Sequence, residues 1–171
     1  MSKKCFIVCP ISDDGSETRK RSNQLLNYII KPVCQECGFD VPDRVDLIPN
    51  PNSITDRIIK CLSTYDLVIV DLTEHNSNVF YELGYRNALQ KPVIQLKLKS
   101  DNIPFDVSNI NTIDYVLNDL DEVQKAKERL TSMIKTFDFQ VLMKLNQIYF
   151  NKIFHLLFCR KYTKLKMIYL R

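Results

Sequence analysis

A single carboxylate, Glu82, is the residue of this sequence best placed to do chemistry. It lies in the stretch VIVDLTEHNSNVFYELGY, residues 68–85, where an apolar run and a polar loop lead into a helical pattern. A carboxylate held among aromatic and aliphatic neighbours can stabilise or attack a cationic centre. The spacing also supports a plainer interpretation. Glu82, Arg86 and Gln90 recur every four residues, as on a solvated helix surface with a Glu–Arg ion pair.

Residues 9–21, CPISDDGSETRKR, form a second candidate, for binding an anion. A helix is expected to start near Thr18, so the cations at 19, 20 and 21 fall in its first turn, where the helix dipole favours negative charge. A bound phosphate would relieve this conflict. The nearby acids at 13, 14 and 17 offer the alternative of an ordinary solvated surface. The candidate substrate-binding residues here are Pro10, Ile11, Ser12, Gly15 and Arg19.

The elements that must position these residues alternate between strand and helix patterns. Short apolar runs predict strands at 4–9, 39–45, 66–72, 92–96 and 112–117. Helical periodicity occupies 18–38, 53–63, 78–90 and 119–137. This order predicts a doubly wound α/β fold with a mainly parallel sheet of four to five strands, flavodoxin-like or TIR-like, followed by a C-terminal helical tail.

Ligands of open parallel sheets bind beyond the carboxyl ends of the strands. Three loops, at 10–17, 45–52 and 72–78, are expected to form that edge. The second and third loops add Asp46, Asp71 and Asn78 to the candidate substrate-binding residues. Asn76 or Asn78 is also expected to cap the helix that carries Glu82.

Four further residues predict local features of the fold. Pro32 should kink or divide the first helix, and Gly38 should end it. Pro42 places the second strand at an edge of the sheet, because proline cannot donate a ladder hydrogen bond. Ser53 with Asp56 three residues later predicts a capping box for the second helix.

Charge divides the 171 residues into two parts. The net charge is +4, but residues 139–171 hold seven of the 24 basic residues and none of the 20 acidic ones, so residues 1–138 carry −3. We therefore expect an α/β domain at 1–138 and a basic amphipathic tail at 139–171, and no nucleic-acid partner for the domain. The tail pattern is typical of a helix packed on the domain or on another copy, with binding to an anionic membrane as the less favoured alternative.

The N-terminal apolar stretch is about six residues, shorter than the roughly 7–15 of a secretory signal, which predicts a cytoplasmic protein with reduced thiols. The single CxxC, Cys34 and Cys37, lies on the apolar face of the first helix, so core packing is favoured over a metal or redox site and no metal is expected. No Walker or GxGxxG pattern follows the first strand, which disfavours a P-loop NTPase or a Rossmann dehydrogenase.

The segment DLVIVDLTEHNSNVFYELGYRNALQKPVIQL, together with CFIVCPISDDGSETRKR, resembles the bacterial TIR-like group related to nucleoside 2-deoxyribosyltransferases. That group commonly reads D-L-T-x-x-N-P-N-V-F-Y-E-L-G, and the resemblance covers residues 4–136. Ser77 stands where the pattern has proline, and no counterpart is found for the early tyrosine and extra aspartate of true deoxyribosyltransferases. The departures put transfer of the sugar in doubt.

The resemblance implies that Glu82 is the catalytic carboxylate of an N-glycosidase that acts on the anomeric carbon of a ribose. It further implies NAD as the substrate, no separate cofactor, activity in a homo-oligomer and a role in antiphage defence. Nicotinamide leaves NAD as a neutral molecule, whereas a purine usually needs a general acid. Because His75 lies in the third loop, a nucleoside or deoxynucleotide hydrolase or transferase stays open, as does a non-catalytic nucleotide-sensing or scaffold module.

Overall fold

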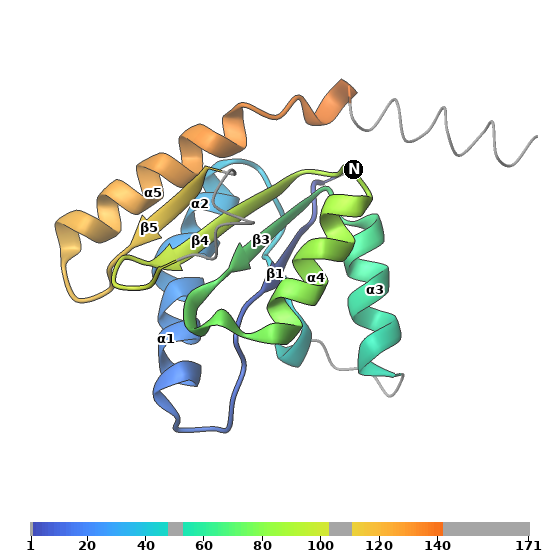
Figure 1. Cartoon of the computed structure of the whole chain (residues 1–171). Coiled ribbons are helices and arrows are strands. Elements are labelled where there is room, and N and C mark those ends of the chain that lie inside the picture. Colours follow the sequence, from blue (N-terminus) through green and yellow to red (C-terminus); the bar gives the residue numbers. More distant parts are fainter. Residues whose placement is uncertain (1, 48–52, 103–110, 142–171) are drawn as a thin grey trace, which may run out of the picture. The chain divides into compact units, whose positions relative to one another are not determined.

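The computed structural model describes residues 2–47, 53–102 and 111–141. Its centre is a five-stranded sheet in which every neighbouring pair is parallel, with the strand order β2-β1-β3-β4-β5 (Figure 1). The strands are β1 (Cys5–Val8), β2 (Asp43–Arg44), β3 (Leu67–Asp71), β4 (Val93–Leu98) and β5 (Thr112–Tyr115). The expected doubly wound α/β fold is therefore confirmed.

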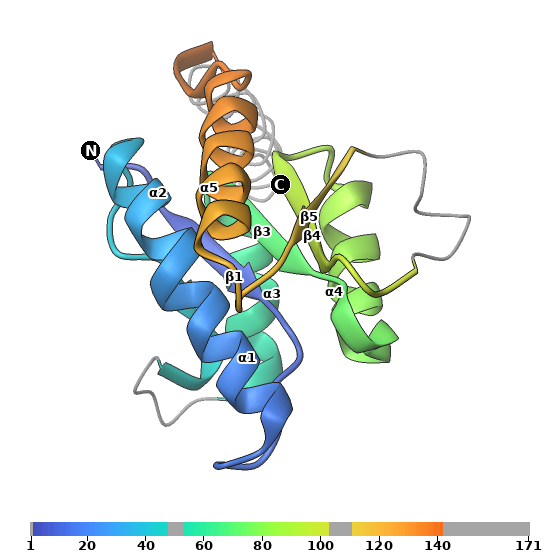
Figure 2. The same ribbon diagram turned by 90° about the vertical axis from the view of Figure 1, so that its left-hand side faces the viewer.

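Helices cover both faces of this sheet (Figure 2). The first group packs among itself and against β5, and the second group packs on β3. The first group is α1 (Glu17–Leu25), the π-helical turn η1 (Leu26–Ile30), α2 (Lys31–Glu36) and α5 (Leu120–Lys135). The second group is α3 (Ile54–Thr64) and α4 (Ser77–Ala88). Two short 3-10 turns, η2 (Val45–Leu47) and η3 (Thr73–His75), follow β2 and β3.

The strand β3 shows why a continuous apolar run predicts a covered parallel strand. All five of its residues are buried. Val68 and Val70 join Leu83 of α4 in the core between the sheet and the helices α3 and α4. Successive side chains of a strand alternate between faces, so Ile69 and Asp71 point to the opposite face, toward the α1 and α5 layer.

The first helix is divided, as Pro32 predicted. The π-helical turn η1 separates α1 from α2, and Pro32 occupies the first turn of α2, where its missing N–H costs no helical hydrogen bond. Gly38 has a φ of +76°, a left-handed conformation that glycine adopts without strain, and it follows the helix end as expected.

Two local predictions need correction. The second strand is two residues long, not seven, and the chain before it forms only an isolated bridge from Phe39 to Lys3. Its edge position is confirmed. Ser53 does stand at the N-cap of α3, but its side chain makes no capping hydrogen bond, so the predicted capping box is wrong.

The chain divides into two compact units, residues 1–137 and 138–171. In the second unit the described residues form the start of a helical turn, where Asp138 accepts hydrogen bonds from the N–H groups of Gln140 and Val141. The predicted amphipathic tail otherwise lies outside the described residues. Within the described part of the chain, no helix is long and apolar enough to cross a membrane.

Candidate functional site

Helix α4 carries Glu82, and its start is fixed by the chain that follows β3. Asn76 is the N-cap, and its Oδ1 accepts hydrogen bonds from the N–H groups of Asn78 and Val79 at 3.0 and 3.3 Å. Of the two residues expected to cap this helix, Asn76 is the one that does so. Because α4 begins directly after β3 ends, its first turns lie at the carboxyl edge of the parallel sheet.

The turn before this cap has an uncommon backbone. Glu74 and His75 have φ values of +66° and +50°, in the left-handed region that residues with a Cβ rarely adopt. Contacts from two distant segments hold the turn. Thr18 donates to both carboxylate oxygens of Glu74 at 2.8 and 3.0 Å, Arg21 contacts the same carboxylate, and the Glu74 N–H donates to Asp101 at 2.9 Å. Strained backbone held in this way is enriched at functional sites.

Glu82 itself is partly buried on the side of α4 that faces the sheet and α3. Its neighbours three residues away are Val79, which is buried in the core, and Tyr85, whose hydroxyl lies 3.1 Å from the hydroxyl of Ser63 in α3. Burial raises the pKa of the Glu82 carboxyl to about 7. No hydrogen bond or ion pair joins this carboxyl to any other described residue. A carboxyl that is partly desolvated and unpaired is a candidate for catalysis.

Arg86 is not the partner of Glu82. Its side chain is fully buried, at 0 % exposed, and it donates only to backbone carbonyl groups. The acceptors are the carbonyl oxygens of Leu62, Tyr65, Asp66 and Pro92, at distances of 2.6–3.2 Å. The interpretation of Glu82 and Arg86 as an exposed ion pair is therefore wrong. Arg86 joins the end of α3 to the chain before β4, and Glu82 keeps an uncompensated carboxyl.

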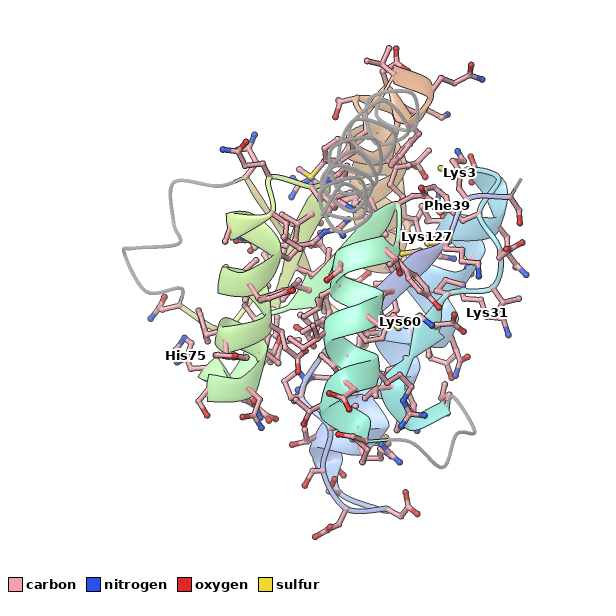
Figure 3. The ribbon with its side chains drawn as sticks, turned by 90° about the vertical axis from the view of Figure 1, so that its right-hand side faces the viewer. Lys3, Lys31, Phe39, Lys60, His75 and Lys127 are labelled. Carbon is pink, nitrogen blue, oxygen red and sulfur yellow. The ribbon has the colours of Figure 1, made fainter. Side chains whose placement is uncertain are left out.

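His75 lies at the start of α4, on the side away from α3 (Figure 3). Its Nε2 contacts the carbonyl oxygen of Asn102, and its ring centre lies 6.4 Å from that of Phe80. Phe80 is two residues from Glu82, about 200° around the helix, so His75 and Glu82 lie on different sides of α4. The structure does not place this histidine where it could protonate a group held by Glu82.

Asn78 and Asp71 are placed very differently. Asn78 is exposed one helical turn before Glu82, so the structure brings these two side chains to one side of α4. Asp71 is 1 % exposed, and its oxygens accept hydrogen bonds from Thr73 and from the Tyr115 hydroxyl of β5. Burial raises the pKa of Asp71, and these hydrogen bonds oppose that shift. Asp71 thus links β3 to β5 on the face opposite Glu82.

The loop from β1 to α1 leaves the sheet at the same carboxyl edge. The Pro10 carbonyl accepts a hydrogen bond from Ser22 at 2.7 Å, which ties the loop to α1, and the side chains of Ile11 and Ser12 are exposed. Gly15 has a φ of +85°, so the turn before α1 requires glycine there. The roles of these residues in binding a substrate stay predictions.

Arg19 and Asp46, both expected to contact substrate, contact each other. Arg19 Nη1 lies 2.8 Å from Asp46 Oδ2, and Arg19 Nε lies 3.3 Å from Asp14. The second guanidinium on Asp46 comes from Arg44, which is 1 % exposed and uses Nε and Nη2 to bind both carboxylate oxygens, at 2.7 and 2.9 Å. The conflict at the start of α1 is thus relieved by the chain's own carboxylates, as the alternative without phosphate predicts.

Sequence reasoning missed three residues that shape this edge: Arg44, Glu74 and Tyr115. Arg44 alternates with Asp46 in a strand pattern, a spacing that puts both side chains on one side. That signal could have suggested the pair, although not its burial. Glu74 and Tyr115 gave no local signal, because their partners lie 56 and 44 residues away in the chain.

No pattern of three or more histidine, cysteine or acidic side chains that could hold a metal ion occurs among the described residues. Cys34 is buried and Cys37 is partly buried, and Cys5, Cys9, Cys34, Cys37 and Cys61 are all free thiols. The packing role predicted for Cys34 fits its burial.

No protein-family model matches this sequence. No curated protein matches it either. Among solved structures, a 2-desoxiribosyltransferase from Leishmania mexicana superposes with a TM-score of 0.44 and 19% identity, over 60% of this chain and 67% of that chain. A CMP N-glycosidase from Clostridium botulinum superposes with a TM-score of 0.49 and 19% identity, over 72% of this chain and 96% of that chain. Likeness at this level does not determine an activity, so the function rests on the site.

The fold and the site together define a doubly wound α/β protein with one unpaired, partly buried carboxyl on a helix at the ligand-binding edge of the sheet.

Proposed function

We propose that the protein is an N-glycosidase that cleaves the nicotinamide–ribose bond of NAD, with Glu82 as its catalytic carboxylate. The observation that carries the proposal is the state of Glu82, whose carboxyl is partly buried, has no partner among the described residues and has a pKa of about 7. A carboxyl left unpaired at the cost of desolvation is difficult to explain by stability alone.

In the proposed reaction the bond between the anomeric carbon and the ring nitrogen breaks, and its electron pair leaves with the base. The ribose becomes a cation shared between the anomeric carbon and the ring oxygen. The ionised Glu82 faces this cation and stabilises or attacks it. Water then adds to the anomeric carbon to give ADP-ribose, or a group of the same nucleotide adds to give a cyclised product.

The surroundings of Glu82 favour a substrate whose base leaves without a proton. Nicotinamide of NAD carries a positive charge on its ring nitrogen and leaves as a neutral molecule. His75, the histidine of the third loop, lies on another side of α4 and contacts Asn102. Arg86, one turn further along the helix, is fully engaged with backbone carbonyls. Neither residue is placed to serve as a general acid beside Glu82.

A nucleoside or deoxynucleotide hydrolase is the second candidate function. With a pKa of about 7, Glu82 is protonated in about half of the molecules at neutral pH and could itself donate a proton to a purine or pyrimidine. A non-catalytic nucleotide-binding module is the third candidate. Activity in a homo-oligomer and a role in antiphage defence belong to the proposal through the sequence resemblance.

The test is release of the free base by the full-length protein from NAD and, separately, from nucleoside monophosphates, measured by chromatography. We expect nicotinamide from NAD and no base from the monophosphates. Glu82→Gln keeps the shape of the side chain but removes the charge that opposes the cation, so release should fall by about 10²–10³-fold or more.

Glu36→Gln is the matched control, because Glu36 is an exposed glutamate of α2 and its loss should leave turnover unchanged. Near-normal turnover of Glu82→Gln would contradict the catalytic role. Base release from monophosphates alone would transfer the proposal to the second candidate. Nucleotide binding without any release, at concentrations that allow assembly, would favour the binding module.

A further inference from the structure

A cavity of about 460 Å³ lies on the opposite side of the sheet from Glu82. One face of α1 forms one wall, and the segments that follow β4 and β5 form the other; these elements lie together on the left of Figure 1. Leu98, Val116 and Leu117 give it an aliphatic wall, and Arg21, Ser100 and Asn118 are among its polar residues. This volume and mixture are typical of small-molecule sites, which span roughly 300–1,000 Å³.

Arg21 is the unusual member of this lining. Its Nη1 contacts the carboxylate of Glu74, while its Nε and Nη2 are buried and have no hydrogen-bond partner among the described residues. The side chain as a whole is only 14 % exposed. Buried donors on a charged group are costly to leave unpaired, so two of them on one guanidinium call for an explanation.

Arg44 shows what this edge of a guanidinium binds in the same protein. Its Nε and Nη2 hold the two oxygens of the Asp46 carboxylate at 2.7 and 2.9 Å. The two nitrogens point in the same direction, so the edge fits a planar carboxylate or two oxygens of a phosphate. Arg21 presents the same edge without a carboxylate from the described chain.

We propose that this cavity is a second binding site, for a small molecule that carries a carboxylate or a phosphate. The oxyanion binds Nε and Nη2 of Arg21, and the apolar body of the ligand packs against Leu98, Val116 and Leu117. Lys99, which also lines the cavity, adds positive potential, although its amine lies 3.0 Å from Glu122. Glu17 is the acid of the lining, and its side chain is 91 % exposed and lies 3.9 Å from Lys20.

The site is separate from the proposed catalytic carboxyl. Arg21 belongs to α1, in the layer of α1 and α5, whereas Glu82 belongs to α4, in the layer of α3 and α4. The proposal therefore does not depend on what Glu82 does. Arg21 does touch Glu74, so a ligand here would also contact the residue that holds the strained turn before α4.

The probes are benzoate, inorganic phosphate and the neutral benzamide, each titrated into the full-length protein at constant ionic strength and followed by amide chemical shifts. We expect a dissociation constant in the millimolar range, about 1 mM, for an oxyanion and no saturable shift with benzamide. Saturation by benzoate alone indicates a carboxylate ligand, and saturation by phosphate alone indicates a phosphate ligand.

Variants locate the binding. Arg21→Gln should weaken it by about tenfold or more, and Arg21→Lys, which keeps the charge but loses the two-pronged edge, should fall between. Because Arg21→Gln also removes the contact with Glu74, Asn118→Trp serves as a second variant that narrows the cavity without touching that contact. Lys20→Gln, on the same helix but outside the lining, and Glu82→Gln should bind like the unchanged protein.

Two results would overturn the proposal. One is the lack of saturable binding of either oxyanion to the folded protein up to about 20 mM, which would leave the two nitrogens of Arg21 to solvent. The other is binding that persists unchanged in both Arg21→Gln and Asn118→Trp, which would place the oxyanion elsewhere on the surface.

Discussion

The charged groups near α1 and the charged group of α4 are treated in opposite ways by the fold. At the start of α1, Arg19 contacts Asp46 and Asp14, and Asp46 also takes both prongs of Arg44. On α4, Glu82 is partly buried and has no charged or hydrogen-bonding partner among the described residues. Compensated charge near α1 builds the edge of the sheet, whereas uncompensated charge on α4 is available for a substrate.

Arg86 makes the contrast sharper, because it is a charged residue on the same helix as Glu82. It is more deeply buried than Glu82 but fully hydrogen-bonded, while Glu82 is less buried and unpaired. Burial by itself therefore does not distinguish an architectural charge from a functional one. The presence or lack of a partner does.

The largest effect on stability is expected at Arg86. Arg86→Leu leaves the carbonyls of Leu62, Tyr65 and Pro92 without a donor, and should lower the free energy of unfolding by about 3–5 kcal/mol. Arg86→Lys keeps one charge but loses the planar fork, so its loss should be smaller. Urea denaturation measures both variants. A loss below about 1 kcal/mol for Arg86→Leu would show that these hydrogen bonds do not join α3 to β4.

The pH dependence of activity tests the other half of the comparison. If ionised Glu82 acts on NAD, kcat/KM should rise about tenfold between pH 6 and pH 8, with a midpoint near pH 7, because the free protein has a Glu82 pKa of about 7. The profile is measured with NAD over this range. A fall across the same range would instead assign the protonated carboxyl as a general acid and favour the nucleoside reaction.

Glu82→Gln should stabilise the fold at high pH while it abolishes turnover. The unfolded carboxyl ionises near 4.5 and the folded one near 7, so ionisation costs stability as the pH rises between these values. After a discount for partial exposure, the variant should gain about 1–2 kcal/mol at pH 8 and nothing at pH 4. Thermal unfolding at the two pH values measures the difference. An equal effect at both would show that burial does not oppose the charge of Glu82.

The smallest effect is expected at Arg19. Because Asp46 retains Arg44, Arg19→Gln should cost about 0.5–1 kcal/mol, and less at high salt. Affinity for NAD should stay unchanged if Arg19 serves only the edge of the sheet. A loss of affinity of tenfold or more would restore the predicted contact between Arg19 and a phosphate, and would place a substrate near the α1 charges after all.

Much of the fold could be predicted because it depends on local patterns. The apolar run of β3 and the apolar face of α5 each contain their own evidence, and Pro32 and Gly38 divide and end a helix through their own backbone chemistry. The short β2 could not be predicted in length, since its extent depends on pairing with β1 and not on its own residues.

The sequence by itself determined the alternation of strands and helices, the carboxyl edge where ligands bind and the position of Glu82 near that edge. Only the tertiary structure decided which charges have partners. Helical spacing offered Arg86 to Glu82, but the carbonyls at the end of α3 and before β4 take it, and Asp46 takes Arg19. The physical reason is that periodicity assigns a residue to a face of its own element, whereas a hydrogen-bond partner is chosen among groups that only folding brings within about 3 Å.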